Sequence, residues 1–113
     1  MLHFQKLDVY QCSIDFLALA HRVLQLPPKG HAELADQLRR AAQSVPQNIA
    51  EGCGRRSRAD KARHYAIARG SAMECASHLD VTRVDQLIDA ELYDRGIELL
   101  ERTVAMLTKL IGP

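Results

Sequence analysis

The sequence has no tryptophan and few other aromatic residues, with three tyrosines and two phenylalanines in 113 residues. Because 47% of the chain is hydrophobic and only 4% aromatic, any core must be aliphatic and rich in alanine. This composition favours closely packed helices over a β-sandwich, since strands are enriched in aromatic and β-branched residues. We therefore predict an all-α fold, and the length predicts a single domain over residues 1–113.

Cysteine is also scarce, and the three cysteines, Cys12, Cys53 and Cys75, are odd in number and widely spaced. They predict neither a disulfide framework nor a Cys-x-x-Cys metal site, and they fit a reducing compartment. The chain lacks a signal-peptide pattern and any run of roughly 18 apolar residues. We expect a soluble, cytoplasmic protein that does not associate with membranes.

Motifs for catalysis are missing as well. The sequence contains no His-Glu-x-x-His, nucleophile elbow, Walker loop or dinucleotide-binding glycine pattern. A di-metal helical site needs two Glu-x-x-His motifs, whereas Glu74 and His78 are four residues apart and have no second copy. We expect no enzymatic activity, no cofactor and no metal.

Four helical segments can be placed along the chain from apolar periodicity and from breaking and capping residues. Pro27 and Pro28 end the first, Ser57 supplies an N-cap for the third, and Asp89 supplies one for the fourth. The predicted helices cover about residues 8–26, 31–52, 58–84 and 90–111. The short connections favour an antiparallel up-down-up-down four-helix bundle.

The first predicted helix has two apolar faces that point in nearly opposite directions. One contains Leu7, Tyr10, Ile14, Leu17 and Leu24, with His21 at the missing position; the other contains Val9, Cys12, Phe16, Leu19, Val23 and Leu26. A helix with two apolar faces needs partners on both, which indicates self-association; the alternative is a deeply buried helix within one bundle. His21 is expected to be a core residue rather than a ligand.

The second and third helices contain proline, glycine and other small residues that affect their shape and packing. Pro46 lies inside the second helix, where we expect a bend rather than a break. Gly52 and Gly54 are expected to end that helix in a left-handed conformation. The third helix is rich in small residues, and Gly70-Ser71 predicts a close helix crossing rather than a phosphate loop.

Charge is sorted along the chain although the net charge is only +1. Residues 39–69 hold eight basic and two acidic residues, a net +6, and the remainder of the chain is −5. The densest part is the segment 55–63, which has five basic residues and one acidic residue. Such sorting predicts a field that attracts polyanions, with a merely solvated helix end as the alternative.

Three words in this region resemble a known family: Gln-Leu-Arg-Arg-Ala-Ala at 37–42, Ser-Val-Pro-Gln-Asn-Ile-Ala-Glu-Gly at 44–52 and Ile-Ala-Arg-Gly-Ser at 67–71. They are similar to words in small bacterial proteins encoded in intervening sequences of large-subunit ribosomal RNA genes, over roughly residues 4 to 111. The family includes the accessory variability determinants of diversity-generating retroelements. The matching motif residues, expected to be structural, are Asn48, Glu51, Gly52, Gly70, Ser71 and Glu74.

This resemblance implies an antiparallel four-helix bundle that assembles into a homopentamer. It also implies a non-catalytic accessory protein that binds nucleic acid through basic surfaces, with a reverse transcriptase as a possible partner. The implied contacts are Arg39, Arg40, Arg55, Arg56 and Arg58, with Lys61 and Arg63 beside them. RNA and DNA are not distinguished, and the scarcity of aromatics argues against recognition by base stacking. The alternative is a protein-interaction scaffold that binds no nucleic acid.

Departures from the family pattern lie early in the third helix. Lys61, His64 and Tyr65 stand where the family usually has bulky apolar residues, which predicts a larger basic surface and a smaller apolar contact. Glu51 and Glu74 lie on helices crowded with small residues. We expect them to be partly buried and paired with an arginine such as Arg39 or Arg69, since an unpaired buried carboxylate is costly.

Overall fold

The computed structural model describes residues 1–25 and 31–113. It has four α-helices, preceded by a short 3-10 helix, η1 (His3–Lys6): α1 (Asp8–Leu24), α2 (Ala32–Gly54), α3 (Arg58–Val84) and α4 (Ala90–Ile111). The all-α prediction is confirmed, and the described ranges contain no strand. The predicted end of the first helix, at Leu26, lies outside the described residues.

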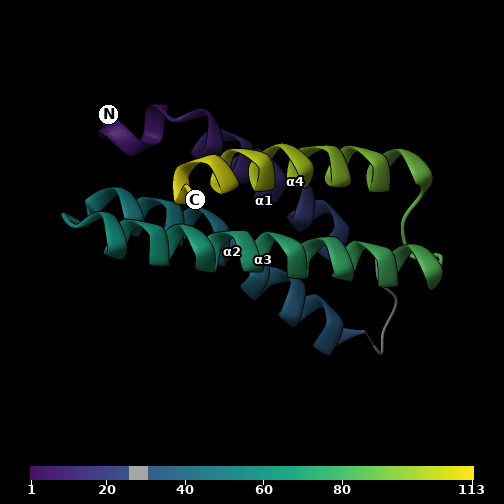
Figure 1. Cartoon of the computed structure of the whole chain (residues 1–113). Coiled ribbons are helices and arrows are strands. Elements are labelled where there is room, and N and C mark those ends of the chain that lie inside the picture. Colours follow the sequence, from purple (N-terminus) through teal and green to yellow (C-terminus); the bar gives the residue numbers. More distant parts are fainter. Residues whose placement is uncertain (26–30) are drawn as a thin grey trace.

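The helices lie side by side in an elongated body of 45 × 29 × 23 Å. Within the described residues the backbones of α1 and α3 each lie close to α2 and α4, whereas α1 lies diagonally across the core from α3, and α2 from α4. This arrangement is compatible with a four-helix bundle. Figure 1 shows both chain termini and the α2–α3 turn at one end of the body, and the α3–α4 connection at the other.

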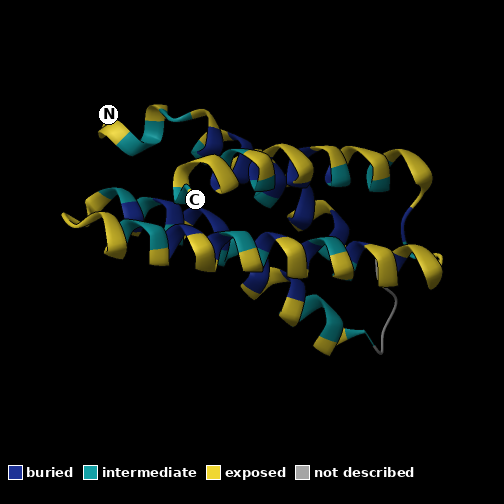
Figure 2. Cartoon of the chain, viewed as in Figure 1, coloured by how far each residue is buried: buried dark blue, intermediate teal, exposed yellow. Residues whose placement is uncertain are grey.

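The core is built from one of the two apolar faces of α1 together with the inner faces of the other helices (Figure 2). Six apolar residues of α1 are buried there: Val9, Cys12, Phe16, Leu19, Ala20 and Val23. The opposite apolar face is only partly covered, and Ile14 on it is 37% exposed. His21 is exposed, so its predicted place in the core was wrong; it lies on this uncovered face.

Gly52 lets α2 and α3 approach closely. A methyl group at Gly52 would lie 2.6 Å from Cε1 of Tyr65, so the tyrosine ring lies directly on the glycine. The predicted left-handed conformation is absent, because Gln86 and Gly112 are the positive-φ residues of the described chain and α2 runs on through Gly54. The helix is also continuous through Pro46.

Of the pair Gly70-Ser71, where a close crossing was predicted, only Ser71 faces another helix in the described chain, with its Oγ 2.8 Å from Ser44 Oγ on α2. Gly70 is exposed, and a methyl group there would meet no atom within 4 Å. The close approach of α3 and α4 occurs instead at Gly96, where a methyl group would lie 2.7 Å from Cδ1 of Leu79. Small residues thus mark tight packing at two of these three glycines, and Gly70 faces outward.

Candidate nucleic-acid interface

The basic segment predicted from the sequence is a tight turn at one end of the body. Arg55 leaves α2 in an extended conformation, with its backbone N–H donating to the Gly52 carbonyl at 3.2 Å. Ser57 then caps α3, its Oγ accepting from the backbone N–H of Asp60 at 3.0 Å, as predicted. Only residues 55–57 connect the two helices, and all three are exposed. The turn is therefore too short to fold its arginine side chains back into the core.

Three of the predicted contact residues have no carboxylate partner. Arg56, Arg58 and Arg63 are exposed, and none of them forms an ion pair with a carboxylate of the described chain. One guanidinium nitrogen of Arg63 lies 3.3 Å from Nε2 of His64, and the exposed side chain can still face an anion. Arg55 contacts Glu51 at 3.0 Å across one helical turn, and both side chains are about half exposed. Exposed pairs of this kind contribute little and exchange readily, so Arg55 can also face a phosphate.

Lys61 has a different role from the one predicted. Its Nζ donates to the carbonyls of Cys53 at 3.0 Å and Gly52 at 3.3 Å. These carbonyls belong to the last turn of α2, beyond the regular i+4 bonding of the helix, and the helix dipole favours a positive charge there. Lys61 therefore joins the start of α3 to the end of α2, and its charge is directed inward.

Arg39 and Arg40 lie away from the turn. Sixteen residues separate Arg39 from Arg55 along α2, about 24 Å at 1.5 Å per residue. Both arginines pair with Asp36, at 3.0 and 3.1 Å. The seven predicted contacts therefore form two separate groups, one at the turn and one halfway along α2.

Two further lysines lie at the same end of the body. Lys6 belongs to η1 and Lys109 to the last turn of α4, and both are exposed. The end of α4 adjoins the start of α3, because a methyl group at Gly112 would lie 3.1 Å from a guanidinium nitrogen of Arg58. Charge density along the sequence could not find these lysines, since each is isolated in its own segment. The predicted up-down order of the helices was the sequence feature that could have placed both lysines at this end.

The opposite end of the body is acidic. Residues 80–94, which span the α3–α4 connection, contain five carboxylates and one arginine. Asp80 accepts a hydrogen bond from the Tyr93 hydroxyl at 2.6 Å, and this bond raises the pKa of the phenol above its ordinary value. The charge sorting seen in the sequence thus becomes a separation of charge along the long axis.

Two motif residues, Asn48 and Ser71, lie in a polar seam between α2 and α3. Ser71 Oγ donates to Ser44 Oγ at 2.8 Å, and Asn48 Nδ2 donates to the Ser44 carbonyl at 2.9 Å. Asn48 Oδ1 faces Nδ1 of the buried His64 at 3.2 Å. Because the amide oxygen can only accept, the histidine nitrogen must donate. These motif residues therefore fix how the helix before the turn packs on the helix after it.

The two motif glutamates are not buried, contrary to the prediction. Glu51 is 55% exposed and pairs with Arg55, and Glu74 is 60% exposed and lies 3.9 Å from His78. Each sits on the outward face of its helix, where the small neighbouring residues do not enclose it.

The departures at His64 and Tyr65 also have a different meaning from the one predicted. Both side chains are buried, and the Tyr65 hydroxyl lies 3.5 Å from Cys53 Sγ. Burial raises the pKa of the Tyr65 phenol well above its ordinary value, and the contact with the Cys53 thiol raises it further. The two residues therefore enlarge the α2–α3 contact instead of the basic surface.

The described residues give little support to metal binding, thiol chemistry or membrane insertion. They contain no group of three or more side chains suited to a metal ion. All three cysteines are free thiols, and Cys12 and Cys75 are buried. Among the helices described, none is long and apolar enough to cross a membrane.

Comparison with known proteins places the chain in a family. The crystal structure of a protein of unknown function from the S23 ribosomal protein family of Bacteroides thetaiotaomicron superposes with a TM-score of 0.84 at 22% identity, covering 93% of this chain and 99% of that one. At this identity the likeness concerns the fold. No curated protein matches the chain. Residues 5–109 match the sequence profile of the 23S rRNA-intervening sequence proteins, and the chain therefore belongs to that family.

Proposed function

We propose that this chain is a non-catalytic accessory protein that binds the phosphate backbone of RNA or DNA through its basic end. The observation that carries the proposal is a group of exposed arginines that form no ion pair with a carboxylate of the described residues, Arg56, Arg58 and Arg63, at the same end as Lys6 and Lys109. Guanidinium groups bind phosphate in a bidentate manner, and contacts to phosphate alone carry no sequence information. Binding is therefore expected to be non-specific and electrostatic.

The active form in this proposal is a homopentamer of antiparallel up-down-up-down four-helix bundles. The support is the partly exposed apolar face of α1 and membership of the family. Fivefold symmetry would bring five basic ends onto one rim. By resemblance to the retroelement members, a reverse transcriptase is proposed as a protein partner, with the rim holding the nucleic acid on which it acts.

The salt dependence of binding follows from the number of phosphates neutralised. If one copy engages three phosphates, the affinity for duplex DNA falls with a logarithmic slope of about −2.7, or about 40-fold between 50 and 200 mM salt. Engagement of two neighbouring copies doubles the slope and gives a loss of about 2,000-fold.

The test is fluorescence anisotropy with labelled RNA and DNA at several salt concentrations. The double substitution Arg56→Gln and Arg58→Gln should cut the slope to about −0.9 per copy. A matched control, Arg22→Gln with Arg95→Gln, removes the same charge from exposed positions near the other end and should leave the slope unchanged. Equal losses in the two variants would mean that net charge, and not the basic end, governs binding. A parent protein that binds neither nucleic acid would favour the scaffold.

A further inference from the structure

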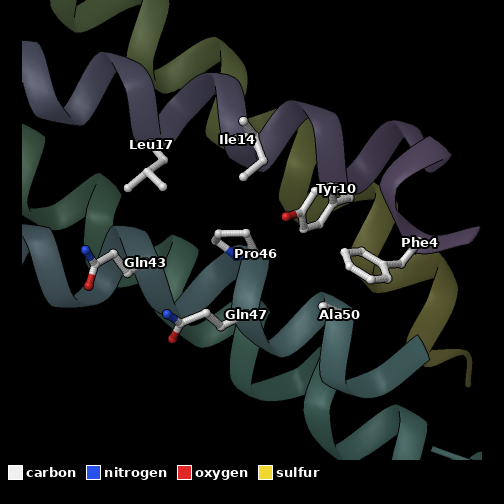
Figure 3. A pocket seen from close by; sticks show the side chains of 8 residues that line it. All are labelled: Phe4, Tyr10, Ile14, Leu17, Gln43, Pro46, Gln47 and Ala50. Atoms are coloured by element: carbon white, nitrogen blue, oxygen red, sulfur yellow. The ribbon is translucent and has the colours of Figure 1, made fainter. Parts of the chain in front are cut away.

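Two grooves with mainly apolar linings lie on the part of the chain that the structure describes. The first lies between α1 and α2, has a volume of about 380 Å³, and is lined by Tyr10, Ile14 and Leu17 facing Pro46 and Ala50 (Figure 3). The second lies between α3 and α4, and its volume is about 330 Å³. Since α1 lies diagonally across from α3, and α2 from α4, in the described chain, the two grooves lie on opposite faces.

Both grooves expose large apolar side chains. Ile14 in the first is 37% exposed and Met73 in the second is 46% exposed. Met73 is flanked by Ala76 on its own helix and by Ile97 and Val104 on α4. The second groove has three alanines among its lining residues, which leaves room for an approaching helix.

We propose that these two faces bind each other in adjacent copies of the chain, the α1–α2 groove of one copy against the α3–α4 face of the next. The inference rests on the self-association proposed above and names its surfaces. Because the two patches differ, the contact is heterologous, and its repetition closes a ring when the rotation between copies permits. A two-fold dimer would instead require one patch to match itself.

The charges at the groove rims are complementary. On α2, Arg40 precedes the groove residues Gln43 and Gln47 at helical spacing. Its side chain is 79% exposed and pairs with Asp36 at 3.1 Å, an exposed pair of the kind that exchanges readily for another carboxylate. On α4, Glu101 lines the second groove, and Asp94 continues the same stripe one turn beyond Ile97. The half of α2 that carries Arg40 and the half of α4 that carries Asp94 both lie toward the α3–α4 connection (Figure 1).

This placement fixes the relative direction of the copies. When neighbouring copies point the same way, Arg40 of one lies level with the acidic stripe of the next. All basic turns then lie on one rim, as multivalent binding to a single phosphate backbone requires. Copies pointing in opposite directions would bring Arg40 toward the neighbour's basic end.

The first test is the mass in solution of the parent and of two single variants, Ile14→Glu and Met73→Glu. Each places a charge in one groove and leaves the other groove intact, so each should reduce the assembly to the 12.6 kDa chain. Val84→Glu is the matched control, because Val84 is 79% exposed and lies outside both grooves. It should keep the mass of the parent, about 63 kDa for five copies.

Mixing the two variants gives the sharper result. The intact first groove of the Met73→Glu chain can bind the intact second face of the Ile14→Glu chain. The two faces left over carry the introduced glutamates and bind no further copy. The mixture should therefore form a one-to-one heterodimer, whereas neither variant alone forms any dimer. A mixture that stays monomeric overturns the heterologous pairing.

Exchanging the two charges tests the proposed contact between Arg40 and Glu101 of neighbouring copies independently. Arg40→Glu and Glu101→Arg should each weaken the assembly about tenfold or more, and the double variant should recover most of the parent's affinity. Failure of this inference is distinguishable from failure of the nucleic-acid proposal. If both groove variants keep the mass of the pentamer, the assigned surfaces are wrong, and if the parent is a monomer, the assembly is wrong. Neither outcome removes the basic end, so the chain should in each case still show salt-dependent binding of nucleic acid.

Discussion

Alanine substitution at two glycines should change stability in opposite directions. Gly52 and Gly70 both lie in helices, but a methyl group at Gly52 would lie 2.6 Å from the buried ring of Tyr65, whereas one at Gly70 would meet no atom within 4 Å. Alanine is favoured over glycine inside a helix by about 0.8 to 1 kcal/mol. Gly70→Ala should therefore stabilise the protein by about that amount.

At Gly52 the steric cost exceeds this gain. Real Cβ atoms do not approach a ring carbon to 2.6 Å, so either Tyr65 or the backbone of α2 must move. Overpacking of this kind costs about 1 to 3 kcal/mol. Part of the propensity gain is lost because Gly52 lies in the last turn of α2. Gly52→Ala should therefore destabilise the protein by about 1 to 2 kcal/mol.

Urea unfolding at one fixed protein concentration measures both effects, since the apparent stability of an assembly depends on concentration. The decisive variant is Tyr65→Ala, which removes the ring. In that background Gly52→Ala should become neutral or stabilising, a coupling of about 1 to 3 kcal/mol. If Gly52→Ala stabilises the parent as much as Gly70→Ala does, the contact with Tyr65 is not what requires the glycine.

The remaining predictions concern single side chains. Burial, together with the charge of Glu74, raises the pKa of Cys75 from 9.0 to about 12, so the folded state favours the neutral thiol. Up to about 4 kcal/mol of stability should therefore be lost as the pH rises from 9 to 12. Cys75→Ala should reduce that loss in unfolding curves recorded in reducing buffer. Lys61→Met should cost about 1.5 to 3 kcal/mol in urea unfolding while leaving the salt slope of RNA binding unchanged, because its ammonium serves the α2 carbonyls. Asn48→Ala should cost about 1 to 3 kcal/mol by leaving the buried His64 Nδ1 without its acceptor, whereas an unchanged midpoint would mean that water replaces the amide.

Sequence reasoning predicted those features of the fold that depend on neighbours in the chain. Ser57 and Asp89 were identifiable as caps because each acts on the backbone three residues later, and both bonds are present. The apolar spacing of α1 identified its two faces, and the structure shows which of them is core.

Features that depend on how helices meet could not be read in the same way. The functions of Gly52 and Lys61 are defined by atoms across the α2–α3 contact, so local rules assigned a left-handed turn to one and a surface charge to the other. Glu51 and Glu74 were misplaced because small neighbours in the sequence do not determine which side of a helix is enclosed. At the candidate site, Arg56, Arg58 and Arg63 could be found from sequence, whereas the lysines contributed by η1 and α4 required the topology.

The position of the two termini has a practical consequence for anyone who purifies this protein. Both lie at the end of the body that carries the α2–α3 turn (Figure 1). An affinity tag at either terminus would therefore lie beside the basic side chains. A polyhistidine tag there could attract nucleic acid by itself, and an acidic epitope could mask the arginines. A circularly permuted chain, with native termini joined and new ones opened between α3 and α4, would move the tag to the acidic end and leave the basic end in its natural surroundings.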